Sequence, residues 1–184
     1  MLIQKKILGI DPGTNIMGFG LIELINQKIN LIEFDVLILE KIKDPHLKLK
    51  KIYEKTTFLI DTYSPNELAV EAPFFGKNIQ SMLKLGRAQG ASMIAGINKN
   101  IPIFEYAPKK IKLAVTGKGQ ASKEQVAAML MYMLQIKQKP KYLDSTDGLA
   151  VAVCHALQKN ISHQKTSTSK SWSEFIKKNP KRII

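Results

Sequence analysis

The chain has 184 residues, of which 45% are hydrophobic and 23% charged, so it is not a disordered chain and is long enough for one ordinary core. Lys and Arg number 28 against 15 Asp and Glu, which gives a net charge of +13 and a pI near 9.7. This excess favours a polyanionic partner, either nucleic acid or an anionic membrane surface. Only two of the basic residues are Arg, so a Lys-rich genome composition is an alternative source of part of the charge.

The single cysteine, Cys154, excludes a disulfide framework within the chain and is typical of a reducing compartment. No signal-peptide pattern follows Met1, and no segment has the roughly 18 uninterrupted apolar residues that a membrane span needs. We therefore expect a soluble, cytoplasmic protein that has no membrane partner.

The first part of the chain predicts strands over residues 6–10, 17–25 and 29–39. Asp11-Pro12-Gly13 is a turn signal after the first strand, and the linker 26–28 is short enough for an antiparallel hairpin.

A helix is then expected from Pro45 to Tyr63, because Asp44 is a good cap and Pro is favoured at the first helical position. A fourth strand covers residues 67–71, and a second helix covers residues 78–99. That helix contains Gly86, Gly90 and Gly96. Because glycine weakens a helix, we expect something to pack closely against all three.

The rest of the domain continues the alternation of strands and helices. A fifth strand is expected over residues 101–106, and Pro108 opens a short helix. The spacing of Ser122 and Gln125 is that of a capping box for a helix to about residue 135, and a last helix starts near Ser145.

A hairpin followed by alternating strands and helices predicts an α/β fold with a five-stranded mixed sheet and helices on both faces. Beyond Leu157 the composition becomes rich in Ser, Thr and Lys. We therefore expect one folded domain over residues 1–157 and a basic, flexible tail over residues 158–184.

Four carboxylates stand at positions that could bring them together. Asp11 ends the first strand, Glu71 ends the fourth, and Asp144 and Asp147 lie three residues apart at the start of the last helix. Ligands collect at the carboxyl ends of strands in α/β sheets, and residues three apart share a helix face. Taken singly, each acid also has a plainer interpretation, as a turn residue or a helix cap.

If the four acids converge, their repulsion raises the pKa of at least one, and a divalent cation relieves it. Oxygen ligands suit Mg²⁺, with Mn²⁺ as a substitute, and such ions promote in-line attack of water on a phosphodiester. We expect Asp11, Glu71 and at least one of Asp144 and Asp147 to converge at one end of the sheet, close enough to share a cation, with a wider spacing allowed when no metal is bound. We also expect no Lys or Arg to neutralise the cluster from inside, since a resident cation would compete with the metal.

Residues 109–123 hold a cluster of lysines suited to neutralising backbone phosphates, with a solvated charged surface as the alternative. Phe74 and Phe75 precede Gly76, and an exposed aromatic there could stack on unpaired bases. His155, on an apolar helix, is expected to be a packed histidine rather than a metal ligand.

The hexapeptide from Gly9 to Thr14 is also similar to the first phosphate loop of the actin, Hsp70 and sugar-kinase class. Those ATPases have two such domains and a second phosphate loop on a longer chain, whereas this chain has one copy. The hexapeptide alone therefore does not separate a nuclease from a nucleotide-binding domain.

The whole set of motifs resembles the RuvC family of Holliday junction resolvases, which have a ribonuclease-H-like fold. The segments that carry the resemblance are ILGIDPGTNIMGFGLIE from Ile7, AVEAPFFGKN from Ala69, LKLGRAQGASMIAGIN from Leu83, IPIFEYAPKKIKLAVTGKG from Ile101, SKEQV from Ser122 and LDSTDGLAVAVCHAL from Leu143. They follow in order over nearly the whole chain to about residue 157.

The resemblance implies a Mg²⁺-dependent endonuclease that resolves four-way DNA junctions by symmetric paired nicks during recombination and repair. It implies that Asp11, Glu71, Asp144 and Asp147 are the catalytic metal ligands. It further implies a homodimer joined through the 78–99 helix, and a RuvA–RuvB branch-migration complex as partner.

The DNA contacts expected on the same basis are a stacking Phe74 and the basic residues Lys112 and Lys123, to which the neighbouring Lys118 is added on its charge and place in the chain. A relative that binds junctions without cutting them is the remaining alternative within this fold.

Overall fold

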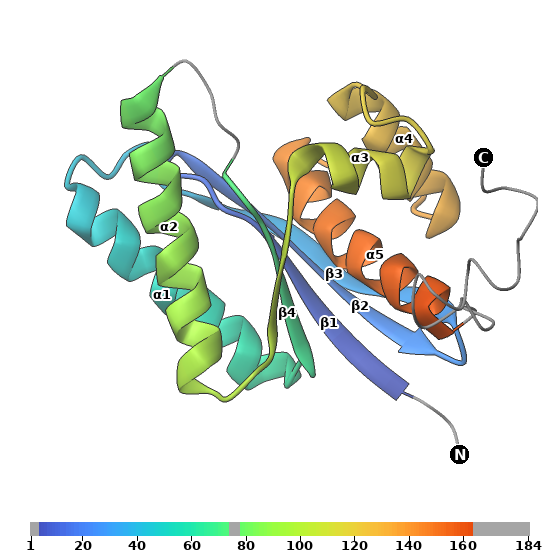
Figure 1. Cartoon of the computed structure of the whole chain (residues 1–184). Helices are drawn as coiled ribbons and strands as arrows, with labels where there is room; N and C mark the ends of the chain where they lie inside the picture. Colours follow the sequence, from blue (N-terminus) through green and yellow to red (C-terminus); the bar gives the residue numbers. More distant parts are fainter. Residues whose placement is uncertain (1–3, 74–77, 164–184) are drawn as a thin grey trace, which may run out of the picture.

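The computed structural model describes residues 4–73 and 78–163, with side chains described as far as residue 158. Phe74 and the chain from residue 164 onward therefore lie outside the described residues. The elements in chain order are β1 Gln4–Asp11, β2 Ile16–Ile25, β3 Lys28–Ile38, α1 Pro45–Tyr63, β4 Glu67–Glu71, α2 Ile79–Asn98, β5 Ile103–Tyr106, α3 Pro108–Thr116, α4 Lys123–Met133 and α5 Asp144–His163 (Figure 1).

The strands form one sheet in the order β3-β2-β1-β4-β5. β1, β2 and β3 are antiparallel neighbours, whereas β4 pairs parallel with β1, and β5 parallel with β4. Asn26 and Gln27 make the tight connection between β2 and β3 with φ of 47° and 71°. The mixed sheet and the hairpin predicted from the sequence are thus confirmed.

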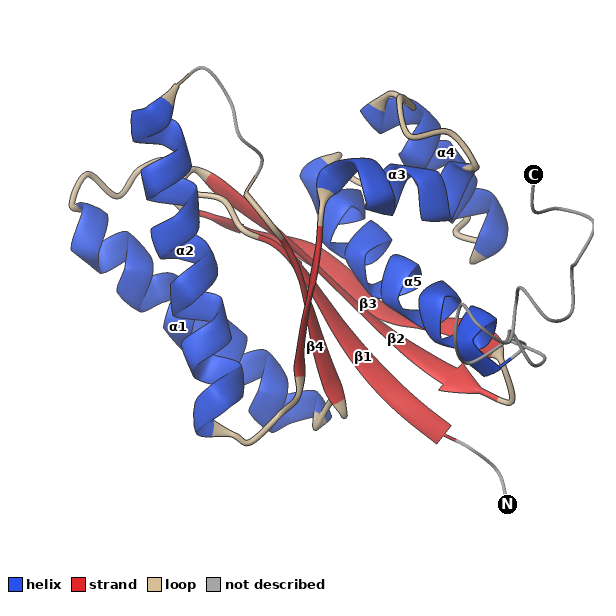
Figure 2. Ribbon diagram, in the orientation of Figure 1, coloured by secondary structure: helices blue, strands red, loops and turns tan. Residues whose placement is uncertain are grey.

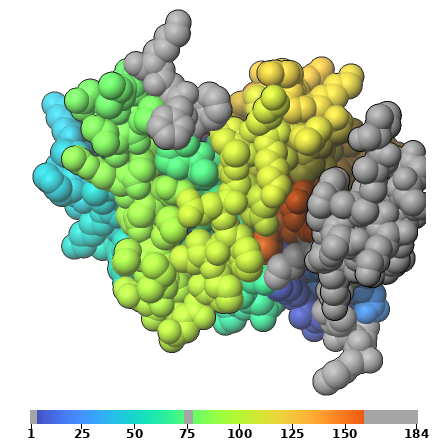
Figure 3. Space-filling view, viewed as in Figure 1, coloured from blue at the N-terminus to red at the C-terminus, as the bar shows by residue number. Residues whose placement is uncertain are grey.

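Helices cover both faces of the sheet, α1 and α2 on one face and α3, α4 and α5 on the other (Figure 2). Two separate cores follow from the alternation of side chains along each strand. In β1, Leu8 and Ile10 pack towards α1 and α2, while Ile7 packs towards α5. In the space-filling view, side chains of the α2–β5–α3 segment fill the space that the ribbons leave open (Figure 3).

Helix α5 lies directly on the backbone of β1 and β2 because glycines face it. A Cβ placed on Gly20 would lie 2.3 Å from Leu149 Cα, and one on Gly148 would lie 2.4 Å from Phe19 Cα. Gly9 and Gly18 are equally close to the backbone of α5. No other residue type allows this approach, so these glycines set the height of α5 above the sheet.

Only one of the three glycines of α2 makes the close contact that the sequence predicts. A Cβ on Gly96 would lie 2.8 Å from Leu68, as expected for close packing. At Gly86 and Gly90 no described atom lies within 4 Å of such a Cβ, so the expected close contact is wrong for these two positions within the described chain. Spacing alone does not tell which face of a helix its glycines occupy.

Among the described residues, no helix is long and apolar enough to cross a membrane. Helix α5 continues beyond residue 157 to His163.

Candidate active site

Asp11 and Glu71 lie side by side at the carboxyl ends of two adjacent parallel strands. Ile10 is in register with Val70, so the next residue of each strand is one of these acids. Side chains alternate along a strand, and Gly9 and Ala69, two residues earlier, face α5. Both carboxylates therefore point to the face that α5 covers.

Asp144 and Asp147 occupy the first turn of α5, which begins over the same end of the sheet. A Cβ on Gly18 would lie 2.0 Å from the carbonyl oxygen of Asp144, so β2 holds the start of the helix by direct backbone contact. Asp147 then lines one pocket with Asp11 and Glu71. The predicted convergence of the strand-end acids with at least one acid of the pair is confirmed.

Lys123 lies inside this acidic cluster, which contradicts the expectation that no cation would do so. Its Nζ donates to Asp144 Oδ1 at 2.9 Å and lies 2.6 Å from Asp147 Oδ2. The residue is the first of α4, whose start is fixed by the capping box of Ser122 and Gln125. This pairing could not be predicted from the sequence because 21 residues separate Lys123 from Asp144, and only the packing of α4 on α5 joins them.

The electrostatics of the cluster follow from burial and like charge. Burial, with Glu71 and Asp147 nearby, holds the pKa of Asp11 well above its ordinary value. Burial and Asp147 raise the pKa of Glu71 to about 7, and burial is also the main cause of the raised pKa of Asp147. Burial lowers the pKa of Lys123, but its hydrogen bonds with the two aspartates outweigh this and raise it. The predicted direction of the carboxylate pKa shift is confirmed, but burial contributes more to it than the predicted repulsion between the acids.

The donor set fits a hard divalent cation, although the side chains as they stand do not cage one. All four acids offer carboxylate oxygens, and their shared repulsion is what a cation relieves. Among the described residues, however, no three His, Cys, Asp or Glu side chains are arranged to hold a metal ion. The expectation that three acids lie close enough to share a cation is not met in this arrangement, in which Lys123 is the counter-ion of the aspartates.

Asp11, Glu71 and Asp147 line a pocket of about 270 Å³ between the sheet end and helices α3, α4 and α5. Lys112 and Lys123 are its basic residues, and its apolar walls come from α3, α4 and α5. A pocket with three acids of raised pKa and two lysines is suited to binding a phosphate ester together with a cation.

Residues 7–155 match the family model described as "Crossover junction endodeoxyribonuclease RuvC". The chain belongs to the RuvC family. The RuvC of Christiangramia forsetii is 58% identical over 183 residues, which are 98% of this chain and 93% of that protein. The RuvC of Cytophaga hutchinsonii is 55% identical, over 98% of this chain and 89% of that protein.

Solved structures of RuvC share the fold. Thermus thermophilus RuvC in complex with a Holliday junction substrate is 28% identical, with a TM-score of 0.79 over 86% of this chain and 96% of that one. The yeast mitochondrial resolvase Ydc2 is 14% identical with a TM-score of 0.63, over 86% of this chain and 81% of that one, which shows the fold alone. The predicted ribonuclease-H-like fold is therefore confirmed, and the actin-like alternative is set aside.

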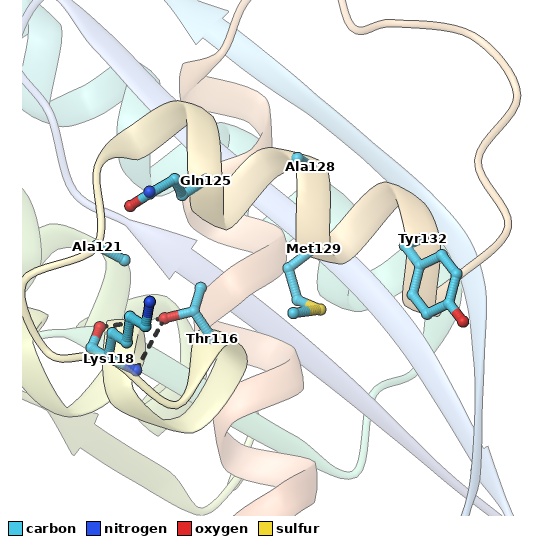
Figure 4. A pocket seen from close by; sticks show the side chains of 7 residues that line it. All are labelled: Thr116, Lys118, Ala121, Gln125, Ala128, Met129 and Tyr132. Atoms are coloured by element: carbon cyan, nitrogen blue, oxygen red, sulfur yellow. Dashed lines mark hydrogen bonds between the residues drawn. The ribbon is translucent and has the colours of Figure 1, made fainter.

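Lys118, the third lysine predicted to contact DNA, lies apart from the acidic pocket of this RuvC-family chain. It borders a pocket of about 440 Å³ between the end of α3 and the outer face of α4, with Met129 and the highly exposed Tyr132 (Figure 4). Its backbone N–H donates to Thr116 Oγ1 at 3.1 Å, which fixes the turn after α3. Phe74, the predicted stacking residue, is outside the described residues.

Two polar contacts that the sequence did not reveal hold the site's strands in place. Gln89 of α2 donates to Glu105 Oε2 at 2.7 Å and to the backbone carbonyl of Glu71 at 3.5 Å. His155 is fully buried and lies 2.6 Å from both Glu67 and Tyr106, which joins α5 to β4 and β5. Its interpretation as a packed histidine is confirmed, but only the fold identifies its partners.

Proposed function

We propose that this chain resolves four-way DNA junctions by symmetric paired nicks during recombination and repair. The observation that carries the proposal is the convergence of Asp11, Glu71 and Asp147 at one end of the sheet, in a chain of net charge +13. Membership of the RuvC family and the likeness to a RuvC bound to a Holliday junction substrate support the choice of substrate.

The proposed cofactor is Mg²⁺, with Mn²⁺ as a substitute, held by Asp11, Glu71, Asp144 and Asp147. When bound, the cation would offset the charge of the carboxylates and lower the pKa of a water molecule for attack on the phosphodiester. The raised pKa values of Asp11, Glu71 and Asp147 support this, because burial and the neighbouring carboxylates disfavour their charged forms and a bound cation would offset both effects.

The lysines of the pocket have the complementary role. Lys112 lines the same pocket as the acids and neutralises the phosphate to be cut. Lys123 is paired with two aspartates in the structure, so its ammonium group becomes available to the DNA once another cation balances those aspartates. Lys118 lies on the turn after α3. Its proposed contact is with the DNA backbone, farther along the same DNA strand.

The partner proposed for symmetric cutting is a second copy of this chain, bound through α2. Ile79, Leu83, Gly86, Gly90, Ile94 and Ile97 follow one another three or four residues apart and so form one stripe along the helix. The four large side chains of the stripe are between 48% and 67% exposed, and the two glycines have open space beside them. Glycines between exposed apolar residues let a second helix approach closely.

The proposal extends to the domain boundary, to Phe74 and to a partner complex. Residues 1–157 are proposed as the nuclease domain and residues 158–184 as a basic tail. Phe74 is proposed to stack on an unpaired base near the crossover. A RuvA–RuvB complex is the proposed partner and the cytoplasm the proposed location.

The test is to incubate the protein with Mg²⁺ and a synthetic four-way junction and to map the nicks on all strands. Two symmetric nicks, absent in EDTA and absent on a linear duplex, are expected. Tight junction binding without any nick would instead indicate a non-catalytic relative of the family, and no preference for the junction over the duplex would refute the substrate.

A further inference from the structure

A second pocket, of about 270 Å³, opens on the other side of the same sheet end from Lys112 and Lys123. Three segments build it: the loop after β1, the start of α1 with the residue before its cap, and the middle of α2. We call it the cationic pocket, because its lining includes the basic residues Lys43, His46, Lys48, Lys84 and Arg87.

No carboxylate lines the cationic pocket. Among the described residues, Lys43, Lys48, Lys84 and Arg87 form no ion pair with an acid. The nearest acid in the sequence, Asp44, caps α1, where it accepts hydrogen bonds from the backbone N–H groups of His46 and Leu47. Four like charges that the fold brings together repel one another, and an anion in the pocket relieves that repulsion.

Hydrogen bonds connect the cationic pocket to the loop that follows Asp11. The half-buried Lys48 donates to the carbonyl oxygen of Thr14 at 2.6 Å and to Asn15 Oδ1 at 3.2 Å. Thr14 is three residues from Asp11, so their Cα atoms are at most about 11 Å apart. An anion held here therefore lies within a few nucleotides of a phosphate bound at the acids.

A hollow of about 170 Å³ adjoins the acidic pocket on the side of α2, lined by Asp11 and Glu71 and by Leu85 of α2. Leu85 follows Lys84, which lines the cationic pocket. The sheet end thus carries acids in the middle, with Lys112 and Lys123 at one end of the path and the cationic pocket at the other.

We propose that the cationic pocket binds a backbone phosphate of the DNA strand that passes over the acids, on the side away from Lys112. The inference rests on the proposed function. Lysine and arginine at both ends of the path would hold the strand at two points, which fixes the position of the phosphate between them. Backbone contacts of this kind position a strand without reading its sequence.

The test compares two double variants that remove the same charge. Lys43→Gln/Lys84→Gln empties the pocket of two cations, while Lys28→Gln/Lys99→Gln removes two lysines from the opposite end of the sheet and of α2. Binding of a synthetic four-way junction is measured in EDTA over a range of salt concentrations. For the pocket variant, the slope of log K against log salt should become shallower by about one unit, because one phosphate contact is lost, while the control should keep the wild-type slope.

Ethylation interference on the same junction then locates the contact. We expect one or two phosphates near the nick whose ethylation weakens junction binding by the wild type and by the control, but not by the pocket variant. Lys43→Arg/Lys84→Arg should restore the wild-type slope, and circular dichroism should show that all variants are folded. A pocket variant with the same slope as the control would overturn the proposal.

Two further outcomes separate the causes of failure. If inorganic phosphate raises the melting temperature of the wild type and not of the pocket variant, while the junction slopes stay equal, the pocket binds a free anion and not DNA. If the wild type shows no preference for the junction over a linear duplex, the proposed function fails first, whatever the pocket does. A wild type that nicks junctions beside a pocket variant with an unchanged slope refutes only the inference.

Discussion

At the scale of single residues, the charge of the site is only partly balanced by the chain itself. Three carboxylates share a pocket with Lys112 and Lys123, and Lys123 contacts only Asp144 and Asp147 of α5 directly. Asp11 and Glu71 are left with no cation in contact among the described residues, which agrees with the raised pKa of each. A divalent cation should therefore lower the pKa of these two side chains more than that of the two aspartates of α5.

Asp11→Asn, Glu71→Gln, Asp144→Asn and Asp147→Asn should each lower the rate of junction cleavage by about 100-fold or more, because amides bind Mg²⁺ weakly. Junction binding should stay within about threefold of the wild type, since it depends on the lysines. Single-turnover cleavage and gel-shift titrations measure the two effects. Near wild-type cleavage by any two of these variants would show that the acids are not the metal ligands.

The raised pKa of Glu71 also predicts how stability depends on pH in EDTA. Its pKa rises from 4.5 to about 7 on folding, so the folded state prefers the protonated side chain. That contribution is fully present below pH 4.5 and is lost as the pH rises through 7, a change on the order of 3 kcal/mol. The wild type should therefore lose more stability than Glu71→Gln between pH 5 and pH 8.

Urea unfolding of both proteins at the two pH values gives this difference directly. Adding Mg²⁺ should raise the wild-type melting temperature more at pH 8 than at pH 5, because protons compete with the metal for the carboxylates. Equal pH dependence in the two proteins would mean that Glu71 titrates normally and lies outside the acidic cluster.

At the scale of elements, the site depends on how closely α5 approaches the sheet. Gly20→Ala puts a methyl group 2.3 Å from the backbone of Leu149, which neither element can relieve by moving a side chain. We expect a loss of about 3 kcal/mol or more of stability, with cleavage lost because Asp144 and Asp147 move with α5. The matched control is Gly119→Ala. The atoms nearest to its new methyl would be Cγ of the exposed Lys109 at 3.0 Å, Cε at 3.2 Å and the carbonyl oxygen at 3.5 Å.

Denaturant unfolding measures both variants, and the control should stay within about 1 kcal/mol of the wild type. If Gly20→Ala were as stable as the control, the close contact between α5 and β2 would not be what holds the helix in place.

The sequence predicted most of the elements because each carries its own local signal. The cap at Asp44, the capping box at Ser122 and the end of the first strand at Asp11 are confirmed at those positions. What it did not predict depends on tertiary packing. Lys123 reaches the aspartates only because α4 packs on α5, and Lys43 and Lys84 share a pocket only because α1 lies beside α2.

At the scale of the whole molecule, the excess of lysine is expected to appear as salt-dependent binding. Lys112→Ala should make the slope of log K against log salt shallower by about one unit, because one phosphate contact is lost. Lys123→Ala should do the same only if its ammonium group leaves Asp144 and Asp147 for the DNA. Titrations at several salt concentrations measure both, and an unchanged slope for Lys112→Ala would make that residue part of a merely solvated surface.

Paired nicking requires two sites on one junction, and the exposed stripe of α2 is where we expect the second chain to bind. Leu83→Glu places a carboxylate in the middle of that stripe, where an interface between two copies would bury it without a partner. The variant should be monomeric at micromolar concentration, whereas the wild type should have twice the chain's mass of 20.6 kDa. Light scattering coupled to size exclusion measures both masses.

Leu113→Glu is the matched control, because Leu113 of α3 is 54% exposed and Leu83 is 53% exposed. It makes the same change in charge and hydrophobicity outside the stripe, so it should remain a dimer. On a supercoiled plasmid that extrudes a cruciform, the wild type and the control should cut both strands in one binding event and release linear DNA. Leu83→Glu should give mainly nicked circles, since a monomer carries one set of acids. A Leu83→Glu protein that stays dimeric and still linearises the plasmid would place the subunit contact elsewhere than on α2.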